Sequence, residues 1–477
     1  MHFTRNKKTI FTVVIATALC LVLSSFSPIA HSETSNIFTL PCTINTYGNA
    51  WNGEIAFDLS ANSTYDLVVM NTNGTVLNVR QSTPSYGPAY NIAPNTLLFE
   101  GEPQAPDTNS AWPVWATHIW NLTSNTTEDF PNVLSEHDIQ YDPTNNTFLT
   151  LQDYVRQVGN NSILMDKIVL VDATGNVLWS WDVYNNIPLS EASTFNETTK
   201  VNGQTVEDFT HANSLDWDYS SGIIYLNSRC TNTFYKINQT TGEIVWACGE
   251  FGNFTLIGDN GNVVSSLWYH SHDTKEVSPD VFTMFDNDYE NVTNPDDCHS
   301  RMLELTLNET SMTAYVNWSW EAPTQYWNDY GGGTVLLPNG DFIGDFGDPS
   351  HQLTQNQPWN FNNTGAVFVE VNTAGQIVRT WTFPAGWYVY RITTLTDQNF
   401  TSTPTPSVLP SSTPINTIKP QTTPTPSVLP SSTPINTIIP QTIINSFALV
   451  AVIMVVTALG IVFYMRKRTS NHKKMQT

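Results

Sequence analysis

Residues 175–181 read GNVLWSW, a glycine turn followed by a short apolar run that ends in tryptophan. The same plan returns in residues 242–246 (GEIVW), 313–320 (TAYVNWSW) and 375–381 (GQIVRTW), and residues 74–77 (GTVL) keep a trace of it. A tight turn that leads into β-branched residues is typical of a hairpin. Because the repeats are spaced widely enough for one four-stranded sheet each, they are typical of a β-propeller.

Short β-rich runs separated by Asn-Gly, Thr-Gly and Asp turns fill the chain around these repeats, and helical periodicity is almost absent. Four repeats are clear, and there is room for two more before residue 137. We therefore expect an all-β fold, a six-bladed β-propeller in residues 65–400, preceded by a short N-terminal β segment in residues 33–64. A long array of β-sandwiches is the alternative.

Both ends of the chain carry targeting signals. Residues 1–32 combine a basic start with an apolar core and small residues, which is typical of a secretory signal peptide; a retained signal anchor is the alternative. Residues 443–464 are long and apolar enough for a C-terminal transmembrane helix, and the basic tail 465–477 is expected to be cytoplasmic. Residues 401–442 hold two nearly identical Thr/Pro/Ser-rich repeats, which predict an extended stalk.

The net charge is −23, from 42 acidic and 19 basic residues, which argues against a nucleic-acid partner. Eight of the basic residues lie in the two ends, so the region between them carries −31. That region also contains fourteen Asn-X-Ser/Thr sequons, which are possible glycan sites. We therefore expect a single-pass protein of the cell membrane whose large domain is extracellular.

Four cysteines remain once the signal peptide is removed: Cys42, Cys230, Cys248 and Cys298. Outside the cell they allow two disulfides, with three possible connectivities. No Cys-X-X-Cys pair is present, which argues against a zinc ribbon.

Histidines recur at matching places in the repeats, in residues 136–139 (EHDI), 211–215 (HANSL) and 270–273 (HSHD). Each segment precedes an apolar run that we interpret as the innermost strand of its blade (residues 147–151, 222–226 and 281–285). Because innermost strands line the channel of a propeller, we expect the histidines to converge at the channel mouth. A purely structural role is the alternative for each, and most of all for His137.

Arg301 is one of few basic residues in the acidic body, and it enters a strand of the same blade as His272. An ion pair on the acidic surface is the alternative for this arginine. His351 lies in a glycine-containing loop after residues 341–344, which we interpret as another innermost strand.

Taken in this order, the segments resemble the nucleotide-independent arylsulfotransferases, aryl-sulfate sulfotransferases with a six-bladed propeller. The resemblance covers about residues 65–395. It rests on DFTHANS at 208–214, His272 before FDN at 285–287, SR at 300–301, FG at 346–347 with His351, and YR at 390–391. It implies ping-pong transfer of a sulfuryl group from a phenolic ester to another phenol through a sulfohistidine, without a cofactor or a metal.

The resemblance also implies roles for single residues. His351 matches the histidine that carries the sulfuryl group, and His211, His272 and Arg301 match the other catalytic channel residues. Asn213 and Arg391 are expected to bind substrate.

The residue types suit this chemistry. A neutral imidazole is a suitable nucleophile, and an arginine stabilises charge on the transferred oxygens. A departing phenolate needs a general acid, which His211 or His272 can provide. No phosphate-binding GxxxxGK[ST] motif is present, in agreement with a donor other than a nucleotide sulfate.

Three other functions fit parts of the sequence. A non-catalytic, glycosylated surface propeller for adhesion or ligand binding agrees equally well with the stalk and the anchor. A quinone-dependent dehydrogenase also has repeated tryptophans, but it usually has eight blades, for which this chain is short. A zinc site at His211, His270 and His272 lacks an evident fourth ligand.

Overall fold

The computed structural model describes residues 40–395, apart from residues 62–63, 83–86, 104–109, 113, 192–196, 259, 289–298 and 348–363. The chain divides into two compact units, residues 1–421 and 422–477, and every described residue belongs to the first. The predicted signal peptide, stalk and transmembrane segment lie outside the described residues, as do Cys298 and His351. Among the described residues, no helix has the length and apolar character needed to cross a bilayer.

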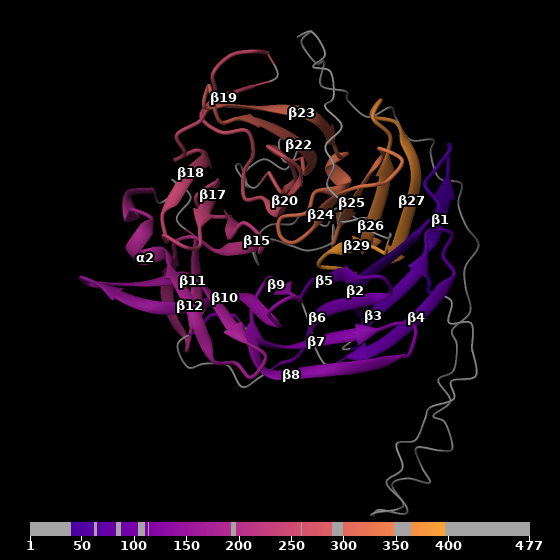
Figure 1. Cartoon of the computed structure of the whole chain (residues 1–477). Coiled ribbons are helices and arrows are strands. Elements are labelled where there is room, and N and C mark those ends of the chain that lie inside the picture. Colours follow the sequence, from indigo (N-terminus) through magenta and orange to yellow (C-terminus); the bar gives the residue numbers. More distant parts are fainter. Residues whose placement is uncertain are drawn as a thin grey trace, which may run out of the picture. The chain divides into compact units, whose positions relative to one another are not determined.

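Six sheets account for most of the described chain (Figure 1). The first contains β2 (Glu54–Ala61), β3 (Thr64–Asn71) and β4 (Val76–Ser82), joined by β28 (Trp387–Tyr388) and β29 (Ile392–Thr394). The second contains β5 (Ala89–Ala93), β6 (Thr96–Pro103), β7 (Trp115–Asn121) and β8 (Thr126–Ser135). The third contains β9 (Ile139–Asp142), β10 (Thr147–Val158), β11 (Asn161–Asp172) and β12 (Val177–Asp182), with β13 (Thr198–Val201) and β14 (Gln204–Asp208).

The fourth sheet contains β15 (Ala212–Asp218), β16 (Ile223–Ser228), β17 (Thr233–Asn238) and β18 (Ile244–Gly249). The fifth contains β20 (His272–Ser278), β21 (Val281–Asp286), β22 (Arg301–Asn308) and β23 (Thr313–Glu321), with β19 (Thr255–Ile257). The sixth contains β24 (Gly333–Leu336), β25 (Phe342–Phe346), β26 (Thr364–Val371) and β27 (Ile377–Pro384), with β1 (Thr43–Thr46). Short helical turns are α2 (Val183–Asn186), η1 (Leu189–Glu191) and η3 (Thr324–Tyr326).

One strand of each sheet lies at the centre of the ring, as Figure 1 shows for β5, β9, β15, β20, β24 and β29. Contacts follow one another around this centre: β29 contacts β5, β9 contacts β15, β15 contacts β20, β20 contacts β24, and β24 contacts β29. The contact between β6 and β9 completes the circle. The described residues therefore form a six-bladed β-propeller, and the predicted all-β class is confirmed.

Both ends of the described chain close the ring. The C-terminal strand β29 pairs with β2 and supplies the innermost strand of the first blade. The N-terminal strand β1 pairs antiparallel with β27, at the outer edge of the last blade. The described part of residues 33–64, which we expected to form a separate segment, thus contributes β1 and β2 to the blades.

The repeated hairpin motif is explained by contacts between neighbouring blades. Each motif spans the turn into an outer strand, namely β12, β18, β23, β27 and, for the weakest copy, β4. The indole N–H of Trp181 on β12 donates to the carbonyl of Gly242, in the corresponding turn of the next blade, at 2.9 Å. Trp246 donates to Glu309 at 2.8 Å and Trp381 donates to the carbonyl of Thr72 at 3.0 Å, again in the next blade. The repeated tryptophans therefore connect each of these blades to its successor.

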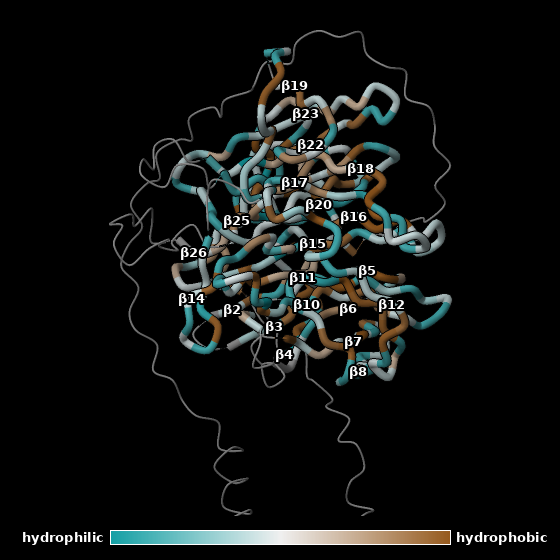
Figure 2. The backbone as a smooth tube through the Cα atoms, turned by 90° about the vertical axis from the view of Figure 1, so that its left-hand side faces the viewer, coloured by the Kyte–Doolittle hydropathy of each residue, from teal (hydrophilic) through white to brown (hydrophobic). Residues whose placement is uncertain are grey.

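The innermost strands lie one strand earlier than we predicted. The apolar runs 147–151, 222–226 and 281–285 belong to β10, β16 and β21, each the second strand of its blade, and residues 341–344 likewise lead into the second strand β25. The second strands are apolar because their two faces pack between neighbouring blades, as Figure 2 shows by apolar stretches within the sheets. Among the innermost strands, β20 (HDTKEVS) and β15 (ANSLDWD) are rich in polar residues, as suits strands that face the channel.

The described cysteines are not joined by disulfides. Cys42, Cys230 and Cys248 are free thiols, and the last two are buried. No disulfide therefore joins any two of the described cysteines, and Cys298, which any set of two disulfides would need, lies outside the described residues.

Candidate active site

Three histidines lie in the same backbone position at the entry to three innermost strands. His137 precedes β9, His211 precedes β15 and His270 precedes β20, with φ angles of +58°, +44° and +58°. This left-handed conformation is uncommon for residues with a Cβ, and histidine is among the residues enriched in it. The third equivalent histidine is thus His270, and His272 lies two residues further along, at the start of β20.

His211 and His137 meet at one end of the channel. Their ring centroids are 5.1 Å apart, and the indole of Trp112 lies 5.0 Å from His211 and 5.6 Å from His137. The Nδ1 atom of His211 is 2.8 Å from Oδ2 of Asp208, close enough for Nδ1–H to donate. Burial disfavours the imidazolium, but the Asp208 carboxylate outweighs burial and raises the pKa of His211.

A second pair of charges lies beside this cluster. Arg229 donates to Glu197 through a short hydrogen bond, and Nδ1 of His270 is 3.0 Å from the other carboxylate oxygen of Glu197. Although burial opposes ionisation, Arg229 and His270 hold the pKa of Glu197 far below its usual range. Burial and the neighbouring Arg229 lower the pKa of His270 to about 4. This part of the site therefore contains a permanent cation next to a neutral imidazole.

His272 has a different environment from His211. Its Nδ1 atom is 2.7 Å from the side-chain oxygen of Asn287, and its Nε2 atom accepts the backbone N–H of Gly331 at 3.1 Å. Burial, and secondarily Arg229 and Arg391, lower the pKa of His272 well below its usual value. His272 is therefore a neutral imidazole whose two nitrogens are both bonded to the protein.

Arg301 is bound to a buried aspartate. Its Nε and one terminal nitrogen donate to Oδ2 of Asp286 at 2.9 and 2.5 Å, and the same nitrogen donates to the carbonyl of Leu267 at 2.9 Å. The other oxygen of Asp286 accepts the backbone N–H of Tyr269 at 2.9 Å. Arg301 and Asp286 thus hold the segment that leads directly into His270.

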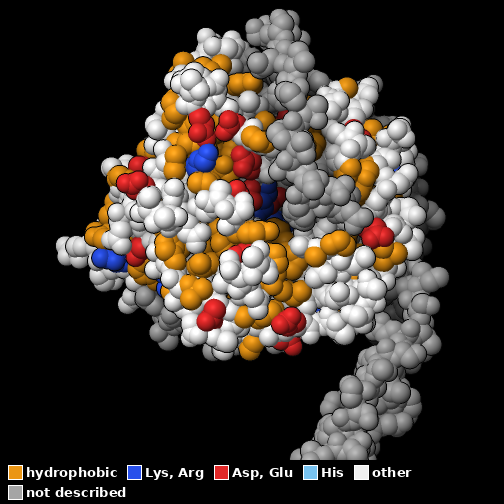
Figure 3. Space-filling view, viewed as in Figure 1, with side chains coloured by type: hydrophobic (Ala, Val, Ile, Leu, Met, Phe, Trp, Pro, Cys, Tyr) orange, Lys and Arg blue, Asp and Glu red, His pale blue; other side chains and the backbone are white. Residues whose placement is uncertain are grey.

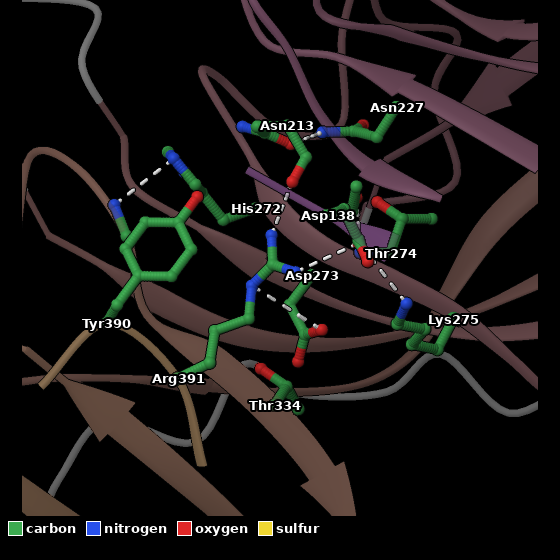
Figure 4. Close-up of polar contacts among 12 residues, drawn as sticks. Asp138, Asn213, Asn227, His272, Asp273, Thr274, Lys275, Thr334, Tyr390 and Arg391 are labelled. Atoms are coloured by element: carbon green, nitrogen blue, oxygen red, sulfur yellow. Dashed lines mark hydrogen bonds and ion pairs between the residues drawn. The ribbon is translucent and has the colours of Figure 1, made fainter. Parts of the chain in front are cut away.

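Arg391 lies at the centre of a buried polar network that crosses the channel (Figure 4). Its guanidinium donates to Asp138 at 3.0 Å and to the carbonyl of Asn213 at 2.5 Å, and it lies 3.8 Å from Asp273. Lys275 approaches the same oxygen of Asp138 at 3.4 Å. Arg391 is 2% exposed. Because its partners lie in three other blades, it connects four blades from inside the ring.

Asn213, which we expected to bind substrate, is wholly buried. Its amide nitrogen donates to the carbonyl of Ser271 at 2.8 Å, and its side-chain oxygen accepts from Asn227 at 2.9 Å. The residue therefore links the segment after His211 to the segment after His270.

A cleft of about 550 Å³ opens on the other side of this network. Arg391 and Asp273 line its inner end, and Asp216, Lys275 and Glu276 line its walls. Figure 3 shows a hollow at the centre of the ring with acidic and basic side chains inside it. Arg391 and Asp273 thus belong both to the buried network and to the lining of this cleft.

His211 precedes the innermost strand β15, His272 begins the innermost strand β20, and Arg391 precedes β29, whereas Arg301 lies two strands further out, on β22. Sequence reasoning missed the contributions of Arg229, Glu197 and Trp112. Arg229 had a usable signal, since it is one of few basic residues in the acidic body. Glu197 and Trp112 lie outside the repeated segments and had no such signal.

Comparison with protein families identifies the family of this chain. The model of the arylsulfotransferase (ASST) family matches residues 123–391, more than half of the chain. The chain belongs to the arylsulfotransferase family. An arylsulfotransferase domain indicates sulfuryl transfer between aryl sulfates and phenols, and the predicted resemblance is confirmed. No curated protein matches the chain.

Several solved structures align with the propeller of this family member. TolB from Acinetobacter baumannii is 10% identical, with a TM-score of 0.35, over 71% of this chain and 67% of its own. A putative 6-phosphogluconolactonase from Bacteroides fragilis is 10% identical, with a TM-score of 0.35, over 73% and 99%. The Cps50 (Swd1) β-propeller domain from Myceliophteria thermophila is 10% identical, with a TM-score of 0.36, over 70% and 88%.

Proposed function

We propose that this protein transfers a sulfuryl group from an aryl sulfate to a phenol in two half-reactions through a sulfohistidine. The observation that carries the proposal is the cluster at the channel end, where a carboxylate-paired His211 lies against Trp112 and near Arg229. An acid, an aromatic face and a cation are the groups that an aryl sulfate requires.

In the first half-reaction, an imidazole nitrogen of His351 attacks the sulfur and the bond from sulfur to the aryl oxygen breaks. The departing phenolate takes a proton from His211, whose imidazolium is stabilised by Asp208. In the second half-reaction, the oxygen of the acceptor phenol attacks the sulfur and the nitrogen–sulfur bond breaks. The phenolic proton passes to His211, which restores the starting state. The role of His351 rests on the family resemblance.

The other residues act through charge and position. Arg229 faces the cluster as a cation, which stabilises charge on the transferred oxygens. The indole of Trp112 is available for stacking with an aryl ring, an arrangement that favours offset or edge contacts. We assign His272, Arg301 and Arg391 to positioning, because their polar atoms are bonded to protein groups.

The same proposal includes the setting of the reaction. A signal peptide, a stalk and a C-terminal helix would place the propeller outside the cell on a single membrane anchor. Aryl sulfates and phenols are small molecules that would reach the channel end from the surrounding medium. The acidic body repels an anionic donor at long range, so the local arginines must supply its binding.

The full-length protein in detergent tests the reaction directly. We expect it to release nitrophenolate from 4-nitrophenyl sulfate and to form phenyl sulfate when phenol is added, without a nucleotide. His351→Asn should abolish the release, and unchanged release by this variant would show that His351 is not the nucleophile. Failure of the wild type with a broad set of phenols would favour the non-catalytic surface propeller.

Mass spectrometry tests the intermediate. Treatment with donor alone should add one sulfuryl group to a peptide that contains His351, and the later addition of phenol should remove it. A modified residue other than His351 would require a different nucleophile, whereas direct transfer without any modified protein would contradict the ping-pong scheme.

A further inference from the structure

Four side chains near the channel end offer a mixed set of metal ligands. Glu197, Asp208, His211 and Cys230 each present one ligand atom, and these atoms lie within 4.8 Å of one another. We propose that this cluster binds a Zn²⁺-type cation, and that the bound ion inhibits sulfuryl transfer by occupying His211. The inhibitory part rests on the proposed function, whereas the binding site does not.

A buried carboxylate oxygen without a partner supports the proposed site. The side chain of Asp208 is 3% exposed, and its Oδ2 atom pairs with His211. Its Oδ1 atom is buried and has no hydrogen-bond partner among the described residues. Because a buried charged oxygen without a partner is destabilising, a cation shared by these four side chains would satisfy it.

The ligand types select the class of ion. Zinc binds imidazole nitrogen, thiolate sulfur and carboxylate oxygen in four-coordinate sites, whereas magnesium and calcium prefer oxygen alone. Cys230 is buried and is a free thiol that already points its sulfur at Glu197, 3.7 Å from Oε2. A thiol that remains unpaired in a domain expected to be extracellular is consistent with a role as a metal ligand.

The surroundings support the ligands and balance the charge. His270 lies 3.0 Å from one oxygen of Glu197 and Arg229 holds the other, so the carboxylate is fixed in orientation, as is common around metal sites. With Cys230 ionised, the cluster carries three negative charges from Glu197, Asp208 and the thiolate. A divalent ion together with Arg229 neutralises them.

Binding of the ion is incompatible with acid catalysis by His211. Nδ1 of His211 lies 2.8 Å from Asp208 Oδ2, and a cation bound at a ring nitrogen of His211 takes the place of the proton on that nitrogen. The loaded histidine is then a neutral ligand, and the N–H that remains on its other nitrogen is a much weaker acid than that of an imidazolium. Zinc should therefore inhibit sulfuryl transfer by occupying the residue that we propose as the acid.

Metal binding is measured first, without reference to activity. The full-length protein is titrated with Zn²⁺ against a chromophoric chelator, and with Co²⁺ followed by absorption. We expect one tight site, and a thiolate-to-cobalt charge-transfer band with the strong visible bands of tetrahedral cobalt. Cys230→Ser should lose the charge-transfer band and weaken Zn²⁺ binding by about 100-fold.

Cys248→Ser is the matched control, because Cys248 is also a buried free thiol and belongs to no such cluster among the described residues. It should bind both ions like the wild type. Asp208→Asn provides a second binding variant in case Cys230→Ser does not fold, and it should also weaken Zn²⁺ binding. Absence of tight binding in the wild type, or an unchanged cobalt spectrum in Cys230→Ser, would overturn the metal site.

Inhibition is measured last. Zn²⁺ at the concentration that fills the site should stop nitrophenolate release by the wild type and leave Cys230→Ser active. Binding without inhibition would overturn the inhibitory role alone. Binding by a protein that never transfers a sulfuryl group would contradict the proposed function and support the metal site.

Discussion

The histidines of the site differ in the direction in which the protein shifts their pKa values. Burial lowers the pKa of His137 and His272 well below the usual value and that of His270 to about 4. His211 alone among these four is raised, because Asp208 outweighs the effect of burial. Of the two general acids that the sequence left open, our proposal therefore uses His211, the one whose pKa is raised.

Asp208→Asn tests this assignment through pH. Since Asp208 raises the pKa of His211, its removal lowers that pKa, and the acid form is lost at a lower pH. The alkaline limb of kcat should therefore move to lower pH, with a loss of about 10²-fold at pH 8 for donors with weakly acidic phenols. Donors with a good leaving group such as 4-nitrophenolate should be affected much less. An unshifted alkaline limb would exclude His211 as the acid.

Arg301 is predicted to act on the loop before His270 instead of on the substrate. Asp286→Asn removes the charged partner of Arg301 and should reduce kcat as strongly as Arg301→Ala, by roughly 10²-fold. KM should change less than kcat in both variants. If Arg301 instead contacts the sulfuryl group, Asp286→Asn would release the guanidinium and leave kcat near the wild-type value.

At the scale of the strand, the sequence reveals the blades more readily than their inner edges. Alternation and tight turns identify the strands, and tryptophans such as Trp181 mark the outer ones because they reach the next blade. The innermost strands β15 and β20 contain more polar residues than the strands beside them, so a search for apolar runs finds their neighbours β16 and β21. The prediction that the histidines lie at the channel mouth does not depend on this one-strand difference, because adjacent antiparallel strands have their ends side by side.

Contacts between residues far apart in the sequence could not be predicted from local patterns. The contact of Glu197 with Arg229 and His270 joins three separate segments, and nothing in local periodicity indicates it. The equivalence of His270 with His137 and His211 is likewise visible only in the backbone, where all three residues have a positive φ.

The left-handed turn before β9 gives a prediction for this element. His137→Gly should keep the free energy of unfolding within about 1 kcal/mol, because glycine adopts φ +58° without strain. His137→Val should lower it by about 2–3 kcal/mol, since a β-branched residue is strained there. Thermal unfolding of both variants measures the difference, and equal stability of the two would show that the turn relaxes.

At the scale of the whole ring, stability depends on the seam where the first and last blades meet. Arg379 on β27 donates to the carbonyls of Trp51 and Thr72 at 3.0 and 3.2 Å, and Glu370 accepts the backbone N–H of Trp51 at 2.5 Å. Trp381 donates to Thr72 as well. These bonds join residues more than 300 positions apart in the sequence, so they form only when the ring closes.

Arg379→Met should therefore open the seam. The change removes a buried guanidinium, and it leaves two carbonyls and the buried Glu370 without their positive partner, which lowers the free energy of unfolding by about 3–5 kcal/mol. Arg156→Met is the control, because Arg156 lies over the ring of Tyr184 within one blade and makes no contact across the seam among the described residues. Thermal unfolding should show a large loss of stability for the Arg379 variant and a small one for the Arg156 variant.

Limited proteolysis should then cut the Arg379 variant first near residues 47–53, because this link between β1 and β2 loses its attachment to β27. Equal melting temperatures for the two variants would mean that the pairing of β1 with β27 and of β29 with β2 closes the ring without the arginine.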